Sequence, residues 1–81
     1  MLKIATKTKL SPEETIKRAT DFFGPSGYGL EVKDQAPSCA YFEGGGGGIQ
    51  VTACAEGKRT SVVLESREWD YQVKEFIRKI R

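Results

Sequence analysis

YFEGGGGGIQV, residues 41–51, decides the fold of this chain, because it sets five consecutive glycines between two strand-like segments. Residues 39–43 (CAYFE) and residues 49–56 (IQVTACAE) alternate apolar and other side chains, which is typical of strands. A phosphate-binding P-loop is excluded, because such a loop ends in Gly-Lys-Ser/Thr and leads into a helix. The glycines therefore predict a hairpin whose connection is either a flexible loop or a lid over a ligand. The glycines of this candidate lid are Gly44, Gly45, Gly46, Gly47 and Gly48.

Pairing the two strands around the glycines predicts a register. Phe42 opposite Val51 aligns the apolar side chains on one face, which is what register selection favours. The same register sets Cys39 directly across from Cys54 on the other face, as a pair of thiols that a reducing cytosol keeps free. No helix is left to cover that outer face, so its half-apolar strip is a candidate homodimer contact. The strip consists of Cys39, Tyr41, Thr52 and Cys54.

Outward from the hairpin, the chain predicts two amphipathic helices. The first spans 12–23, because Ser11 is a good N-cap and Glu14 completes a capping box. The second lies within 66–81 (SREWDYQVKEFIRKIR), where apolar residues recur at helical spacing and Ser66 is the candidate cap.

Three further segments alternate with period 2 and predict strands, at 2–9, 30–35 and 60–66. The element order is then β-α-β-β-β-β-α. Hairpin-length connections between the last strands predict a mostly antiparallel sheet. Two helices suffice for one face of such a sheet, so we expect an α+β two-layer sandwich, a single domain over 1–81.

Composition excludes several chemistries. The chain has two cysteines and no histidine, so it lacks the ligands of an ordinary zinc site and the usual general base. We therefore expect no enzyme activity, no metal and no cofactor. No apolar run approaches the length of a membrane span, and the N-terminal segment lacks the apolar core of a signal peptide, so we expect a cytoplasmic protein without membrane contact.

The charge balance does not favour nucleic acid. Thirteen Lys and Arg residues face eleven Asp and Glu residues, a net charge of +2, and no recognition motif is present. Nucleic-acid binding is thus the least favoured hypothesis. Its candidate contacts are Lys3, Lys7, Lys9, Lys58 and Arg59.

The chain resembles a shortened helix-grip domain of the START-like and polyketide-cyclase-like superfamily. The resemblance lies in residues 3–23, where SPEE opens the helix, and in REWDYQVKEFIRKI at 67–80. It implies an apolar ligand held between a curved sheet and the C-terminal helix. The chain departs from that family in predicting four strands after the first helix where the family has six. Small α+β proteins of microbes resemble the same pattern equally well.

Two functional hypotheses are favoured over nucleic-acid binding. The first is a non-catalytic binding domain for an apolar small molecule, with its ligand between the sheet and the C-terminal helix and the glycine run as lid. The same side chains would also serve as an ordinary compact core. The alternative is a protein-interaction or homodimerisation module that uses the uncovered sheet face. The candidate ligand-binding residues are Phe23, Phe42, Val51, Trp69, Val73, Phe76 and Ile77.

Overall fold

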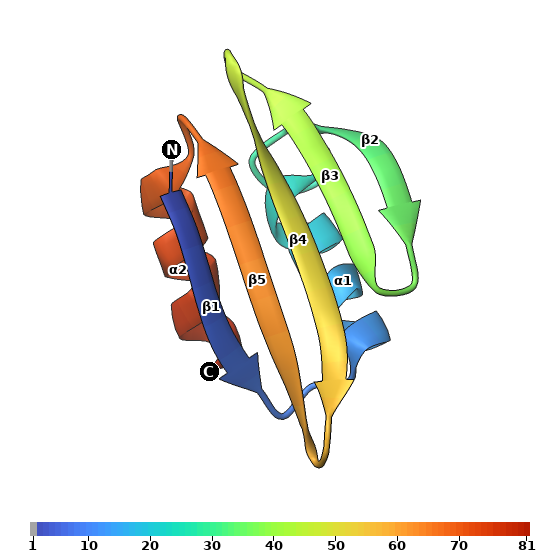
Figure 1. The fold of residues 1–81 in the computed structure, drawn as a ribbon. Coiled ribbons are helices and arrows are strands. Elements are labelled where there is room, and N and C mark those ends of the chain that lie inside the picture. The colour runs from blue at the N-terminus through green and yellow to red at the C-terminus, as the bar shows by residue number, and fades with distance from the viewer. Residues whose placement is uncertain (1) are drawn as a thin grey trace.

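The computed structural model describes residues 2–81 and has the predicted element order (Figure 1). The predicted bounds of the first helix are confirmed, and the strand bounds shift by at most two residues. The elements are β1 (Leu2–Thr8), α1 (Pro12–Phe23), β2 (Glu31–Ala36), β3 (Cys39–Gly44), β4 (Gly47–Glu56), β5 (Arg59–Arg67) and α2 (Asp70–Ile80).

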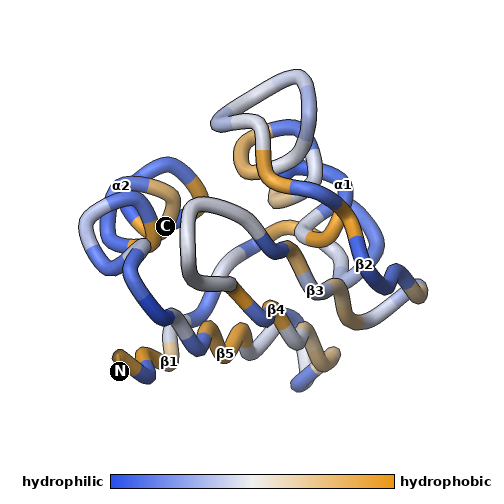
Figure 2. The backbone as a smooth tube through the Cα atoms, turned by 90° about the horizontal axis from the view of Figure 1, so that it is seen from above, coloured by the Kyte–Doolittle hydropathy of each residue, from blue (hydrophilic) through white to orange (hydrophobic). Residues whose placement is uncertain are grey.

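The strands form one five-stranded sheet in the order β1-β5-β4-β3-β2, and every neighbouring pair is antiparallel. Both helices lie on the same side of this sheet, next to each other (Figure 2). Helix α1 packs against β3 and β4, and α2 packs against β5 and β1. The predicted two-layer α+β sandwich is therefore confirmed.

The two helices begin differently. The predicted Ser11 cap of helix α1 is confirmed, because the Ser11 hydroxyl accepts the N–H of Glu14 at 3.1 Å. The Glu14 carboxylate accepts from Arg18 Nε instead of completing the predicted capping box. The expectation that Ser66 caps the second helix is wrong. Trp69 is the N-cap residue of α2 and makes no side-chain cap, while the Ser66 hydroxyl donates to the Asp70 carboxylate at 2.9 Å. The strand β5 runs on to Arg67, which keeps Ser66 inside the sheet.

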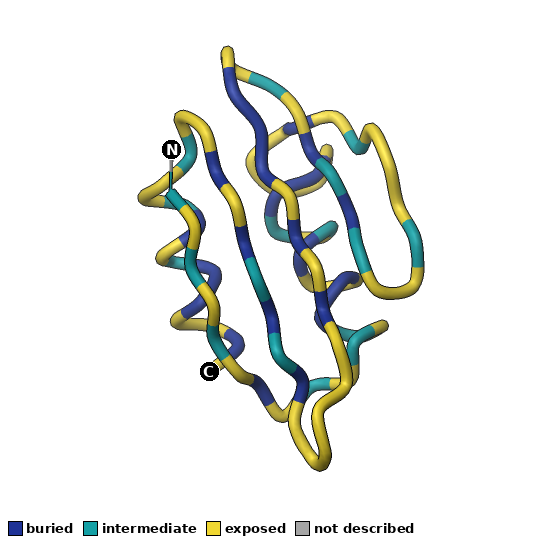
Figure 3. Tube along the Cα trace, viewed as in Figure 1, coloured by how far each residue is buried: buried dark blue, intermediate teal, exposed yellow. Residues whose placement is uncertain are grey.

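The core lies between the sheet and the helices, and burial alternates along the central strands (Figure 3). Phe42 and Val51 are both 0% exposed, so the prediction that they share the inner face is confirmed. The buried hydrophobic residues are Ile16, Ala19, Phe23, Leu30, Ala40, Phe42, Ile49, Val51, Ala53, Val62, Leu64, Val73, Phe76, Ile77 and Ile80.

The predicted register of the β3–β4 hairpin is wrong by two residues. Phe42 lies across from Ile49, and Cys39 lies across from Thr52, so no cross-strand cysteine pair exists. Cys54 instead faces Ser61 on β5. The shift is an even number, so every side chain stays on its predicted face although its partner changes.

The glycine run explains this shift. Strands β3 and β4 continue through Gly44 and Gly47, which pair with each other, and only Gly45 and Gly46 remain as the turn. Their φ angles are 58° and 81°, the two positive values of a type I′ hairpin turn. The expectation of a flexible five-residue loop is therefore wrong, because glycines that have a strand partner extend the ladder.

Between Leu2 and Arg81, neither helix has the length and apolar character required to cross a membrane.

Candidate functional site

The sequence-predicted ligand residues are indeed brought together, but mostly as packed core. All except Trp69 have at most 6% of their surface exposed. The ring centroid of Phe23 lies 5.8 Å from that of Phe42 and 5.2 Å from that of Phe76. These rings occupy the space between sheet and α2 where a ligand was expected.

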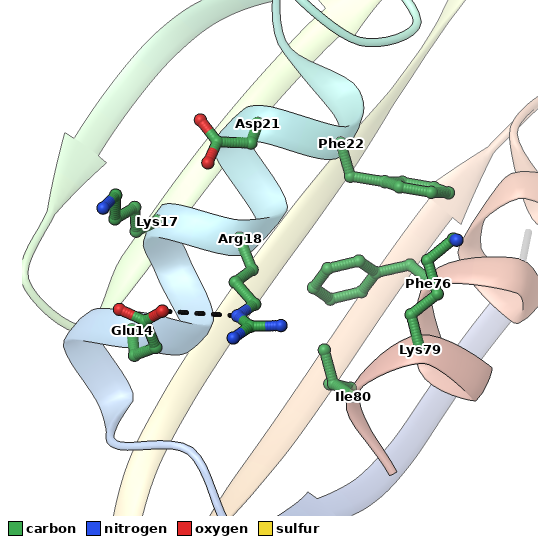
Figure 4. A pocket seen from close by; sticks show the side chains of 8 residues that line it. All are labelled: Glu14, Lys17, Arg18, Asp21, Phe22, Phe76, Lys79 and Ile80. Atoms are coloured by element: carbon green, nitrogen blue, oxygen red, sulfur yellow. Dashed lines mark hydrogen bonds and ion pairs between the residues drawn. The ribbon is translucent and has the colours of Figure 1, made fainter.

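An open groove lies within the helix layer, between α1 and α2 (Figure 4). Its volume is about 510 Å³, within the range of small-molecule sites. Of the predicted ligand residues, Phe76 lines it. The lining residues are Glu14, Lys17, Arg18, Asp21, Phe22, Phe76, Lys79 and Ile80.

The floor of the groove is apolar. Phe22 reaches from α1 and Phe76 from α2, and Figure 4 shows the two rings pointing toward one another, with centroids 5.5 Å apart. Ile80 lies one helical turn beyond Phe76, on the same face of α2. Phe22 is half-buried, whereas Phe23 next to it is fully buried, so the Phe-Phe pair serves both the groove and the core.

The rim of the groove is charged and exposed to solvent. Arg18 Nε donates to the Glu14 carboxylate at 3.3 Å, and Lys79 Nζ lies 5.9 Å from the centre of the Phe22 ring. Sequence reasoning missed this site. The available signal was Phe22, an aromatic residue beside the core-facing stripe, where a solvent-facing residue would be polar.

The glycine hairpin does not form a lid over the groove. None of its glycines lines the groove. Trp69 Nε1–H donates to the carbonyl oxygen of Gly44 at 2.9 Å, which attaches the hairpin to the start of α2. Tyr28 lies against Trp69 with ring centroids 6.0 Å apart. The predicted lid residues are thus an exposed two-residue turn, Gly45 and Gly46, flanked by strand glycines of which Gly47 and Gly48 are buried.

The predicted interface strip does lie on the uncovered sheet face. Cys39 and Tyr41 are half-buried, while Thr52 and Cys54 are exposed. A row of small, uncharged side chains crosses all five strands at this level, one from each strand. In register order the row is Ala5, Val63, Thr52, Cys39 and Ala36.

Reactive chemistry is sparse in the part of the chain that the structure describes. No three Cys, Asp or Glu side chains among residues 2–81 gather into a metal-binding group. A hydrogen bond from Tyr71 to the Glu75 carboxylate, and the negative charge of that carboxylate, raise the pKa of Tyr71. Tyr71 is 68% exposed and lies outside the groove, so this pair is a surface contact.

The groove therefore offers an apolar floor and a charged rim. Comparison of the chain with protein-family models, with curated proteins and with solved structures found no match.

Proposed function

We propose that this chain is a non-catalytic binding domain for an apolar small molecule, and that the ligand lies in the groove between α1 and α2. One observation carries the proposal: the half-buried Phe22 ring, beside the mostly buried Phe76 and Ile80, gives an apolar floor between two helices in an open space of about 510 Å³. An apolar floor with a polar rim is the usual make-up of small-molecule sites.

The packing of the core favours the groove over the sheet–helix space. Filling that inner space with a ligand would require Phe23, Phe42 and Phe76 to separate, and close-packed interiors resist such changes. The groove takes a ligand without moving the core. Because one side of the groove stays open to water, we expect modest affinity that grows with the length of the apolar chain.

A chain-length series tests the proposal. We expect 1-octanol, 1-decanol and 1-dodecanol to bind with affinity rising about twofold per CH₂, which is less than the roughly fourfold of full burial (about 0.8 kcal/mol), because one side of the groove is open to water. Backbone amide shifts measured by NMR should move along α1 and α2. Affinity without chain-length dependence, or shifts confined to the outer sheet face, would contradict the groove.

A matched pair of variants locates the ligand. Phe22→Ala removes the half-buried ring from the floor, and we expect it to weaken 1-decanol binding about tenfold or more. Tyr71→Ala removes an aromatic ring from the solvent-facing side of α2, outside the groove. It should leave the affinity unchanged, and equal losses in both variants would count against the site.

We further propose, as a second candidate function, that the uncovered sheet face pairs with a second copy of this chain. The five-strand row of small side chains leaves this face flat at its centre. Lys7 on β1 pairs with Glu56, and Glu31 on β2 pairs with Lys33. Lys3 on the β1 edge and Asp34 on the β2 edge form no ion pair among the described residues, so the β1 edge keeps a small positive charge and the β2 edge a small negative charge. A two-fold axis along the strands would set the basic edge of one copy over the acidic edge of the other.

Light scattering with one added charge tests this second candidate. A dimer through the sheet face should become a monomer in Thr52→Arg, because two such cations would meet near the axis. Tyr71→Arg, on the helical side, should remain dimeric. A wild-type monomer at millimolar concentration would rule the dimer out.

A further inference from the structure

A second hollow adjoins the groove. The elements that line it, β1, α2 and the start of β5 beside the β4–β5 turn, come together at one end of the molecule (Figure 1). Its volume is about 380 Å³, and it shares Arg18, Lys79 and Ile80 with the groove. Six of its lining side chains are basic and none is acidic. The basic residues are Lys7, Lys9, Arg18, Arg59, Lys79 and Arg81.

The fold gathers these cations from distant parts of the chain. Lys9 follows β1, Arg18 is on α1, Arg59 begins β5, and Lys79 is in the last turn of α2. Two buried threonines join the same elements. The Thr8 hydroxyl donates to the Ile80 carbonyl at 2.5 Å, and the Thr60 hydroxyl donates to the Leu10 carbonyl at 2.6 Å. The hollow is thus held by defined contacts.

Local carboxylates neutralise only part of this charge. Lys7 Nζ pairs with Glu56 at 2.9 Å, and Arg18 pairs with Glu14 at 3.3 Å. Among the ion pairs formed by residues 2–81, none involves Lys9, Arg59 or Lys79. The carbonyl end of α2 contributes roughly half a negative charge, which is less than these three cations together. A net positive potential therefore remains at this end of the groove.

We propose that the ligand of the groove is an amphiphile with a single anionic headgroup, such as a long-chain carboxylate. Its chain lies over Phe22, Phe76 and Ile80, and its head lies among Lys9 and Arg59. Lys79, whose Nζ lies 5.9 Å from the centre of the Phe22 ring, turns from that ring toward the head when the ligand binds. This inference rests on the proposed function, since it adds a headgroup to the apolar ligand. The apolar floor of the groove and the basic hollow share lining side chains, so a single ligand can contact both.

Two other anions fit the surface less well. A free inorganic anion would use the hollow and leave the apolar floor bare. A nucleic-acid backbone needs a basic track several phosphates long. Here Glu14 and Asp21 lie along the groove, and Glu56 flanks the hollow, so the basic surface ends within a short distance.

The test compares ligands with the same chain and different heads, below their aggregation concentrations. We expect decanoate to bind wild-type protein about tenfold more tightly than 1-decanol, since three partly exposed charge contacts together give roughly that factor. The difference should shrink as salt is raised from 20 to 200 mM, because salt screens exposed charges. Decyltrimethylammonium should bind more weakly than 1-decanol.

Variants of the hollow separate head from chain. The double variant Lys9→Gln/Arg59→Gln should lower decanoate affinity to near that of 1-decanol and leave 1-decanol binding unchanged. Lys58→Gln serves as the control, because Lys58 neighbours Arg59 on the turn but does not line the hollow. Thermal unfolding of each variant confirms that it is folded.

The outcomes distinguish the two proposals. Equal affinity for decanoate and 1-decanol overturns the headgroup inference and leaves the apolar groove standing. Binding of neither ligand overturns the proposed function and the headgroup with it. If acetate or phosphate binds as tightly as decanoate, the hollow is a site for free anions. If an oligonucleotide displaces decanoate, the hollow is a nucleic-acid contact. Either result overturns the headgroup inference.

Discussion

The two hairpins at opposite ends of β4 have turns of the same length and different surroundings (Figure 1). The β3–β4 turn consists of Gly45 and Gly46, and the β4–β5 turn consists of Gly57 and Lys58. Each turn has a glycine with positive φ, 58° and 81° in the first and 64° at Gly57 in the second. Glycine therefore provides the positive φ angle that each turn requires.

The difference lies in what surrounds the glycines. A Cβ atom at Gly47 would lie 2.0 Å from the carbonyl oxygen of Arg67, because the connection from β5 to α2 passes directly over it. At Gly48 a Cβ would lie 2.8 Å from the Tyr41 hydroxyl. At Gly57 nothing lies within 4 Å. At the β4–β5 turn, glycine is needed only for its positive φ angle. At the β3–β4 hairpin, glycine is needed for positive φ angles and also because there is no room for a Cβ atom at Gly47 and Gly48.

The largest expected effect comes from filling that space. Gly47→Ala should destabilise the fold by about 3 kcal/mol, because backbone rather than a flexible side chain blocks the new methyl group. Urea unfolding measures the loss. Gly44→Ala is the matched control, since its Cβ would meet Leu30 at 3.5 Å, an ordinary contact. Equal losses in both variants would contradict a crowding effect specific to Gly47.

Removing the indole ring beside the glycine hairpin should have the next largest effect. Trp69→Ala is expected to cost about 2 kcal/mol, because it removes ring contacts with Tyr28 and the hydrogen bond to Gly44. Trp69→Phe keeps an aromatic ring but no N–H donor, and should cost about 1 kcal/mol. Faster amide hydrogen exchange at Gly47, which pairs with Gly44 at the end of the ladder, in both variants would link the loss to the hairpin. Unchanged exchange there would show that the indole stabilises something else.

At the opposite hairpin, only backbone conformation should matter. Gly57→Ala is expected to cost about 1 kcal/mol, because an L-residue is strained at positive φ. Gly57→Asn should cost less than half of that, since Asn tolerates this conformation. Thermal or urea unfolding of the pair measures the difference. An Asn variant as unstable as the Ala variant would point to crowding at this turn as well.

The smallest effect is expected at the ion pair beside the β4–β5 turn. Lys7 and Glu56 are 56% and 58% exposed, so Glu56→Gln should change the free energy of unfolding by about 0.5 kcal/mol or less. The same variant releases Lys7 toward the basic hollow and should tighten decanoate binding. A large loss of stability would show that the pair organises the hollow rather than flanks it.

Much of the fold was predictable because its signals are local. The cap at Ser11, the bounds of α1 and the inner face of Phe42 and Val51 all follow from spacing within a few residues. The groove was not predictable in the same way. Phe22 and Phe76 lie far apart in sequence, and their meeting depends on two helices packing side by side on one sheet.

The sequence by itself determined the order of the elements, the ends of the first helix and the side of the sheet on which each strand residue lies, since periodicity and capping act over short stretches of chain. Only the tertiary structure decided the partner of each strand residue, because a shift of two residues preserves every face and so leaves no trace in the pattern. It also decided which glycines lack room for a side chain and which lysines and arginines share one hollow. Those properties depend on atoms that approach from Arg67, Tyr41 and the end of α2, and no local stretch of sequence contains them.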